Sequence, residues 1–136
     1  MRISAKAEYA CLAVIALARK FHEDRPLPIH EIADAQGIPA KFLTHILLRL
    51  KRAGLVTSTR GSSGGYRLAR APEEISLLDV LKVIDGYGMT SAERSAPSAP
   101  VLAQIWNQIR ASEAAVLSGT SIAKLLEQSE VQNWVI

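Results

Sequence analysis

Two helical segments joined by a tight turn constrain this sequence more than any other feature. Residues 29–36, I-H-E-I-A-D-A-Q, place apolar residues at helical spacing, and Gly37 after them suits the left-handed position that ends a helix. Pro39 then occupies the first position of a second segment, which runs to Arg52. A helix of about two turns, a glycine turn and a longer amphipathic helix are together typical of a helix-turn-helix.

A glycine-rich hairpin is predicted directly after this unit. The runs L-V-T-S-T-R and Y-R-L-A have the β-branched and aromatic content of strands. The loop between them, G-S-S-G-G at residues 61–65, holds glycines that permit the positive φ angles a hairpin loop needs. We expect Tyr66 to pack beneath this hairpin rather than to contact a ligand. A hairpin in this place is the wing of a winged helix.

Helices are predicted on both sides of the helix-turn-helix and wing. Ser76 caps a helix that ends at Gly86, and Asp79 completes a pair resembling a capping box. Ser4 is placed as the N-cap of the first helix of the chain. The apolar stripe of that first helix is predicted to comprise Cys11, Val14, Ile15, Ala18 and Phe21.

The C-terminal part is predicted to hold a loop, a long helix and a short last helix. Residues 87–100 contain few apolar anchors, so we expect a loop that is mobile in isolation. The short last helix is placed at residues 121–128. The long helix before it is amphipathic, and we assign to a dimer interface its apolar residues Leu102, Ile105, Trp106, Ile109 and Val116. For Trp106, a place in a ligand pocket stays open as the alternative.

These elements define a mainly α fold with a small β-hairpin wing, a winged helix-turn-helix followed by a long dimerisation helix. A chain of 136 residues with 49% hydrophobic content can build one modest core. We divide it into a DNA-binding domain at residues 1–86, a flexible loop at 87–100, and a dimerisation region at 101–136. The sequence holds no long apolar run and no secretory signal pattern, so we expect a cytoplasmic protein.

The charge is distributed unevenly along the chain. Residues 1–70 hold 12 Lys/Arg against 5 Asp/Glu, a net +7, whereas residues 71–136 hold 4 against 8, a net −4. A basic half suits a polyphosphate partner, because affinity for DNA comes largely from neutralising phosphates and releasing their counterions. Charge alone leaves a merely solvated basic surface as an equal alternative.

The wording of these elements resembles the Rrf family of bacterial winged-helix regulators typified by IscR and NsrR. The resemblance is carried by the start M-R-I-S-A-K-A-E-Y-A, the run G-I-P-A-K-F-L-T-H-I-L-L-R-L-K-R-A-G-L-V, the wing S-T-R-G-S-S-G-G-Y-R-L-A and the later S-L-L-D-V-L-K-V-I-D-G. It covers residues 1–86 almost continuously. The resemblance implies a homodimeric transcription factor, usually a repressor, that binds a palindromic operator.

One feature of the family is missing from this sequence. Its best-known members hold an iron-sulfur cluster through cysteines in the loop before the long helix, sometimes with a ligand from the first helix. Here residues 87–100 contain neither Cys nor His, and Cys11 is the single cysteine of the chain. We therefore expect no cofactor and no metal, and a signal that arrives through a small molecule, a partner protein or oxidation of Cys11. A cleft roofed by residues 87–100 is the predicted place for such an effector.

The third predicted helix has the pattern of a recognition helix. Its inward stripe is predicted to be Phe42, Leu43, Ile46, Leu47 and Leu50. Lys51 and Arg52, near its end, are expected to meet the DNA backbone. The face left outward, which we expect to enter the major groove, is formed by Ala40, Lys41, Thr44, His45 and Arg49.

The wing is predicted to be a second DNA-reading element. Arg60 can enter a narrow minor groove, where the negative potential is concentrated. Ser62, Ser63 and the backbone amides of Gly64 and Gly65 are expected to contact phosphates. A nucleotide-binding phosphate loop is the alternative for these glycines, but the Lys-Ser/Thr that such a loop requires does not follow them.

Other residues that bear reactive groups have simpler interpretations. Cys11 fits a small buried hydrophobe better than a redox switch, and Glu8 fits a salt bridge better than a cluster ligand. His22 and His30 are expected to be exposed, with no metal-ligand spacing to Cys11 or His45. We find no catalytic constellation, so we expect a DNA-binding regulator and not an enzyme. A winged module that binds protein is the remaining alternative, since a fold does not fix a function.

Overall fold

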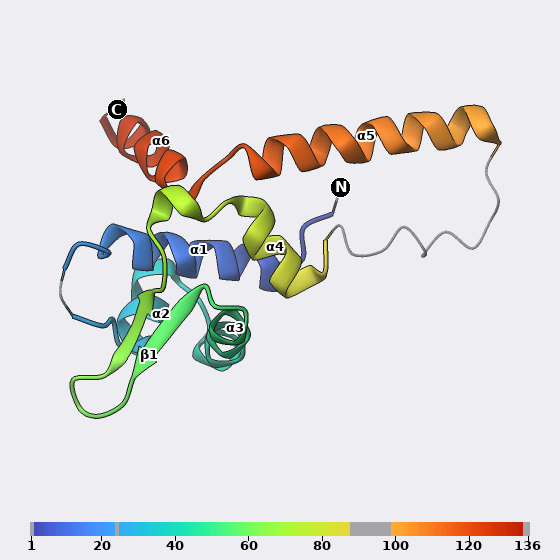
Figure 1. Ribbon diagram of the computed structural model, residues 1–136. Coiled ribbons are helices and arrows are strands. Elements are labelled where there is room, and N and C mark those ends of the chain that lie inside the picture. The colour runs from blue at the N-terminus through green and yellow to red at the C-terminus, as the bar shows by residue number, and fades with distance from the viewer. Residues whose placement is uncertain (1, 24, 88–98, 135–136) are drawn as a thin grey trace.

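The computed structural model describes residues 2–23, 25–87 and 99–134, with side chains as far as residue 129. Six α-helices, one hairpin and a short 3₁₀ turn follow one another within these residues (Figure 1). Their order is α1 (Ala5–Arg19), α2 (Ile29–Gln36), α3 (Ala40–Arg52), β1 (Val56–Thr59), β2 (Gly65–Leu68), η1 (Pro72–Glu74), α4 (Leu77–Asp85), α5 (Pro100–Ser118) and α6 (Ile122–Trp134). The predicted class, mainly α with a small hairpin wing, is confirmed.

Helix α1 lies at the centre of the fold. It begins as predicted, because the hydroxyl oxygen of Ser4 accepts a hydrogen bond from the Ala7 amide at 3.0 Å. Helices α2, α3, α4 and α6 all contact it. Ala7, Ala10 and Ala13 are completely buried. Their methyl side chains let neighbouring helices approach α1 on several sides.

The predicted stripe of α1 is only partly the buried one. Val14 and Ala18 belong to the buried core, whereas Cys11, Ile15 and Phe21 are half-buried at its margin. The difference has a packing cause. Because α1 is surrounded by helices, the tightest contacts fall on alanines, which a search for large apolar residues passes over.

The helix-turn-helix forms at the predicted residues. Gly37 ends α2 in the left-handed conformation, with φ 66° and ψ 33°, and the Ile38 amide donates to the Ala33 carbonyl at 3.1 Å. Helix α3 begins one residue later than predicted, because Pro39 is extended at φ −59° and ψ 129° and serves as the N-cap. The inward residues Leu43, Ile46, Leu47 and Leu50 are buried, and Phe42 is half-buried.

The wing is an antiparallel hairpin that is extended by a third segment of chain. Val56 pairs with Leu68, and Thr59 with Gly65. On the other edge of β2, the Tyr66 amide donates to the Leu27 carbonyl at 2.8 Å, and the Leu27 amide donates to the Tyr66 carbonyl at 2.9 Å. These two hydrogen bonds hold the segment before α2 against strand β2 of the wing.

The end of α5 and the start of α6 join the same core as the helix-turn-helix. Ile122 is completely buried, and its amide donates to the Ile75 carbonyl at 2.8 Å. The Leu77 amide donates to the Thr120 carbonyl at 3.0 Å. Helix α6 extends to residue 134, beyond the predicted end at 128. Figure 1 shows α5 projecting away from the other helices toward its N-terminal end.

Two further predictions concern the loop at residues 87–100 and the start of α4. The predicted loop at 87–100 lies almost entirely outside the described residues. The capping box of α4 is confirmed, since Ser76 accepts from the Asp79 amide at 3.1 Å while the Asp79 carboxylate accepts from the Ser76 amide at 2.9 Å. Among the described residues, each helix is too short or too polar to cross a membrane.

Gly65 is a sensitive position for the stability of the wing. A Cβ atom there would lie 2.3 Å from the Leu27 carbonyl oxygen, which is inside van der Waals contact with backbone. We expect Gly65→Ala to separate β2 from Leu27 and to lose their two hydrogen bonds, destabilising the fold by about 2 kcal/mol. Urea unfolding followed by circular dichroism measures this change. Ser63→Ala in the exposed loop is the control, and equal stability of the two variants would contradict the expectation.

Candidate nucleic-acid interface

The outward face of α3 is a row of exposed polar side chains. Ala40, Lys41, Thr44 and His45 are all exposed, and they lie together in the first two turns of the helix. The Thr44 hydroxyl donates to the Ala40 carbonyl at 3.1 Å. The Lys41 ammonium lies 5.1 Å from the centre of the Phe42 ring. Both contacts are made by the polar ends of exposed side chains, which remain accessible to solvent.

Arg49 is placed differently from the prediction. It was expected on the outward face, but it is half-buried against α4. Its guanidinium donates to the carbonyl oxygens of Val83 at 2.7 Å and Ile84 at 3.1 Å. Those carbonyls belong to the last turn of α4, where helical carbonyls lack partners within the helix. Arg49 therefore satisfies the end of α4 in this structure instead of projecting from α3.

Leu48 is a residue of the outward face that the sequence reasoning missed. Its side chain is 41% exposed. It lies four residues after Thr44 and four before Arg52, so all three share one face of the helix. Its apolar type suggested a core position and concealed this location. The spacing from Thr44 and Arg52 is the signal that could have identified it.

The last turn of α3 is hydrogen-bonded to the wing. The Lys51 ammonium donates to the Ser58 hydroxyl of β1 at 2.7 Å. Arg52 is exposed beside it. Both cations lie at the end of α3 that leads into the hairpin, as expected for residues that could contact a nucleic-acid backbone.

The tip of the hairpin is exposed and is shaped by glycine. Arg60, Ser62 and Ser63 are exposed there. The Gly64 amide donates to the Gly61 carbonyl at 3.0 Å, so it closes the turn and is not the free phosphate donor that was predicted. A Cβ atom on Gly64 would lie 2.2 Å from the Thr59 carbonyl oxygen. The backbone of Gly65 lies against Leu27, since a Cβ atom on Gly65 would be 2.3 Å from the Leu27 carbonyl oxygen.

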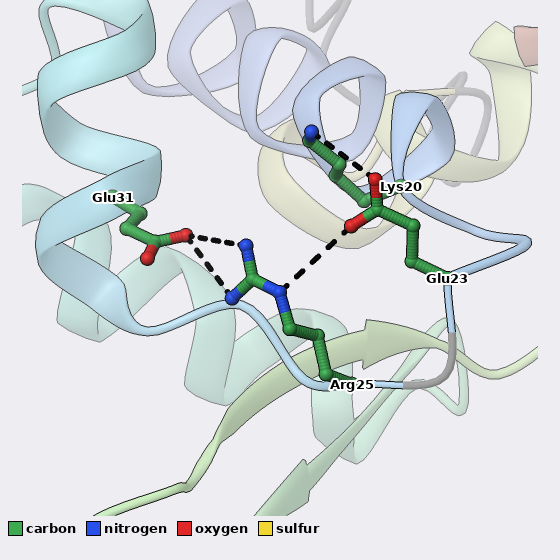
Figure 2. A network of polar contacts seen from close by, with 4 residues as sticks. All are labelled: Lys20, Glu23, Arg25 and Glu31. Carbon is green, nitrogen blue, oxygen red and sulfur yellow. Dashed lines mark hydrogen bonds and ion pairs between the residues drawn. The ribbon is translucent and has the colours of Figure 1, made fainter.

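A chain of ion pairs fixes the loop in front of α2 (Figure 2). The Lys20 ammonium lies 3.3 Å from the Glu23 carboxylate, and the Arg25 guanidinium lies 3.8 Å from Glu23 and 3.5 Å from Glu31. Arg25 thereby connects the end of α1 to the first turn of α2. Two of the carboxylates in the basic half of the chain are thus paired with neighbouring cations, and they oppose a nucleic-acid partner less.

Helix α5 exposes a row of large apolar side chains. The five residues predicted for a dimer interface are all exposed, from 36% at Trp106 to 67% at Val116. Val101, which the prediction omitted, is 70% exposed. Leu102, Ile105 and Ile109 recur at helical spacing, so they form one apolar stripe. An exposed apolar stripe of this kind marks an interaction surface.

Cys11 lies among acidic neighbours and apolar packing. The pKa of its thiol is raised to about 11, mainly by burial and in smaller part by the carboxylates of Glu8 and Asp85. Glu8 is exposed.

Within the described ranges, no three His, Cys, Asp or Glu side chains gather as metal ligands would. His22 and His30 are exposed, as predicted.

A helix-turn-helix with an exposed polar face, a basic hairpin wing and a long helix with an exposed apolar stripe together define an HTH-type, winged-helix transcription regulator. The sequence pattern of the Rrf2 family, described as iron-dependent transcriptional regulators, matches residues 3–128. This chain belongs to that family. The predicted resemblance is confirmed, and the family consists of transcription regulators rather than enzymes.

Individual relatives agree with this assignment. The chain is 42% identical over 130 residues to a Mycobacterium tuberculosis protein named as an HTH-type transcriptional regulator, covering 90% of this chain and 80% of the relative. It is 31% identical over 130 residues to CymR of Bacillus subtilis, covering 96% and 93%. The solved structure of B. subtilis CymR, the global cysteine regulator, superposes with a TM-score of 0.84 at 30% identity, covering 94% and 98%.

The family description names iron, so we compare the donor groups of this chain with those that an iron-sulfur cluster needs. An iron-sulfur cluster needs several thiolate or comparable soft ligands. The chain has one cysteine, and burial raises the pKa of its thiol, which disfavours the thiolate form that ligates iron. Residues 87–100 supply neither Cys nor His. The side chains that are present do not fit a cluster of the cysteine-ligated type.

The raised pKa of Cys11 has a direct chemical consequence. Only the thiolate attacks alkylating agents, and a pKa near 11 instead of 9.0 leaves ~100-fold less thiolate at pH 8. We expect iodoacetamide to modify native Cys11 correspondingly slowly, with a rate that rises toward pH 11. Mass spectrometry of the labelled protein measures the rate, and the urea-unfolded chain is the control. Similar rates for the native and unfolded chains would contradict this expectation.

Proposed function

We propose that this regulator is a sequence-specific repressor that binds a palindromic operator as a homodimer. Helix α3 enters the major groove and the wing contacts the adjacent minor groove. The observation that carries the proposal is the exposed row of Lys41, Thr44 and His45 in the first half of α3, on the same side as the basic turn that leads to the wing. A recognition helix contacts base edges through its N-terminal residues.

Each side chain of this row can read a base. Lys41 donates to guanine O6 and N7 or to a phosphate, and His45 bonds either a base edge or a phosphate. Thr44 presents both a hydroxyl and a methyl group, so it suits a thymine methyl or a base acceptor. Leu48, on the same face, adds an apolar group that can contact a thymine methyl.

The wing and the end of α3 supply the remaining contacts. Arg60 extends from a narrow glycine turn, which allows the hairpin to approach DNA closely and insert the guanidinium into the minor groove. Ser62 and Ser63 at the tip, together with Arg52 at the end of α3, contact phosphates. The hydrogen bond from Lys51 to Ser58 keeps the wing and α3 in register for this purpose.

The apolar stripe of α5 supports the dimer. Burying this stripe against a second copy removes the exposed part of several large side chains from water, and each contributes a fraction of the roughly 1.5–3 kcal/mol gained when such a side chain is buried completely. One chain offers one recognition helix, whereas a palindrome has two half-sites. A two-fold dimer through α5 therefore matches the symmetry of the operator to that of the protein.

Selection from a random duplex library, followed by a salt titration on the selected sequence, tests this function. We expect an enriched inverted repeat and an affinity that falls steeply with salt, because each neutralised phosphate contributes about 0.9 to the slope of log K against log salt. Enrichment of no sequence, with little dependence on salt, would instead favour a winged module that binds protein.

The recognition row yields a prediction about specificity. Lys41→Ala, Thr44→Ala and His45→Ala each remove a group from the groove, and we expect each to weaken operator binding by about 1–3 kcal/mol where that group reads a base. Fluorescence anisotropy on the operator and on single-base variants measures the loss and shows which base loses discrimination. Lys124→Ala, an exposed lysine of α6, is the control. Unchanged affinity and specificity in all three variants would remove α3 from the interface.

The stripe of α5 yields a prediction about assembly. We expect Ile105→Asp combined with Ile109→Asp to produce monomers, because two carboxylates would have to be buried in the apolar interface. Sedimentation velocity measures the mass, and operator binding falls with it. The matched control is Gln104→Asp combined with Gln108→Asp, which adds the same charge at neighbouring exposed positions. A dimeric isoleucine variant would place the interface elsewhere.

A further inference from the structure

The C-terminal end of α4 is a point where three separate parts of the chain converge through polar contacts. The guanidinium of Arg49 on α3 donates to the Val83 and Ile84 carbonyls. The Ser4 hydroxyl, at the start of α1, donates to the Asp85 carboxylate at 2.7 Å. Two residues further on, the Tyr87 hydroxyl donates to the Glu113 carboxylate of α5 at 2.6 Å. Within a few residues, this end of α4 thus contacts the helices proposed for DNA reading and for dimerisation.

Arg49 holds α3 to the end of α4 through two hydrogen bonds. A guanidinium presents its donors in a rigid planar fork, and here two of its nitrogens engage two successive carbonyls. The negative end of the α4 dipole strengthens these bonds. Because Arg49 is half-buried and so engaged, a shift of the last turn of α4 moves α3 with it or breaks both bonds.

The contact from Tyr87 joins the same end of α4 to α5. The Tyr87 hydrogen bond is the main reason that the pKa of Glu113 lies below its usual value, so the charged carboxylate is the form that holds this contact. Only a short stretch of chain separates Tyr87 from the Val83 and Ile84 carbonyls that Arg49 contacts. It consists of the last turn of α4 and of Gly86, which ends α4 in the left-handed conformation at φ 65°.

We propose that Arg49 is a positioning residue, which sets the placement of α3 by gripping the end of α4, and that the Tyr87–Glu113 contact extends this connection to α5. This inference rests on the proposed DNA-binding function and adds a route for its regulation. A change in the placement of α5 reaches the recognition helix through the end of α4. Coupling of this kind requires that the two contacts act on each other energetically.

The first arm of the test separates positioning from direct contact with DNA. Arg49→Met keeps the length of the side chain and removes its donors, and Arg49→Lys keeps the charge and removes the fork. We expect about tenfold weaker operator binding for both variants, with the salt slope of the wild type. A slope reduced by about 0.9 in the Met variant, with affinity restored by Lys, would identify a phosphate contact and overturn the proposal. Unchanged affinity of the Met variant would also overturn it.

The second arm tests the connection to α5. Tyr87→Phe removes only the hydroxyl, and we expect about twofold to threefold weaker operator binding. The loss should be smaller when Arg49→Met is already present, because a relay that is broken at one point transmits less from the other. Exactly additive losses, or no loss in Tyr87→Phe, would overturn the relay.

Two controls keep the outcome interpretable. Circular dichroism and thermal melting of every variant show that the fold is retained at the temperature of the binding assay. Lys41→Ala distinguishes this proposal from the proposed function. If wild-type protein selects an operator and Lys41→Ala weakens its binding, the function stands and the Arg49 results judge the inference alone. If the wild type selects no DNA sequence, the proposed function fails, and the inference that rests on it fails with it.

Discussion

Close packing around α1 is the constraint on which the rest of the structure depends. Four helices contact α1, and Ala7, Ala10 and Ala13 are completely buried where they meet. A larger side chain at such a position would force the surrounding helices apart, at a cost of typically 1–3 kcal/mol. Helix α3 is one of these neighbours, so its orientation is determined by contacts on its buried face. The side chains on the opposite face of α3 are exposed and can contact a partner.

Local signals in the sequence predicted the element boundaries well, because they act within a few residues. Gly37 and Gly86 adopt the left-handed conformation that ends a helix, and Ser76 forms its capping box with Asp79. These features depend on backbone geometry and short-range hydrogen bonds, which residue type largely decides. The winged fold followed from the order of such elements together with the resemblance of residues 1–86 to a known family.

Tertiary contacts decided the places where the sequence reasoning failed. Arg49 carries a charge and was assigned to the outward face, yet the carbonyls at the end of α4 recruit it. Leu48 is apolar and was passed over, yet it is 41% exposed on the recognition face. Arg49 lies near the boundary between the buried and exposed faces of α3, where periodicity alone decides poorly, and its placement depends on α4, which is distant in sequence. Leu48 lies well within the exposed face, between Thr44 and Arg52, and its apolar residue type rather than its spacing led the prediction astray.

The anchoring of α5 and α6 connects the apolar stripe of α5 to the position of α3. Ile122 is buried in the core that holds α3, and its amide bonds to Ile75 just before α4. The C-terminal end of α5 is therefore fixed relative to α3, while its apolar stripe is exposed. In a two-fold dimer through that stripe, the separation of the two recognition helices follows from the crossing of the two α5 helices. Half-site spacing on DNA is sensitive to this separation, because successive major grooves on one side of the duplex recur at about 34 Å. In the proposed dimer, a small rotation at this interface therefore changes the separation of the two α3 helices and with it their fit to the two half-sites.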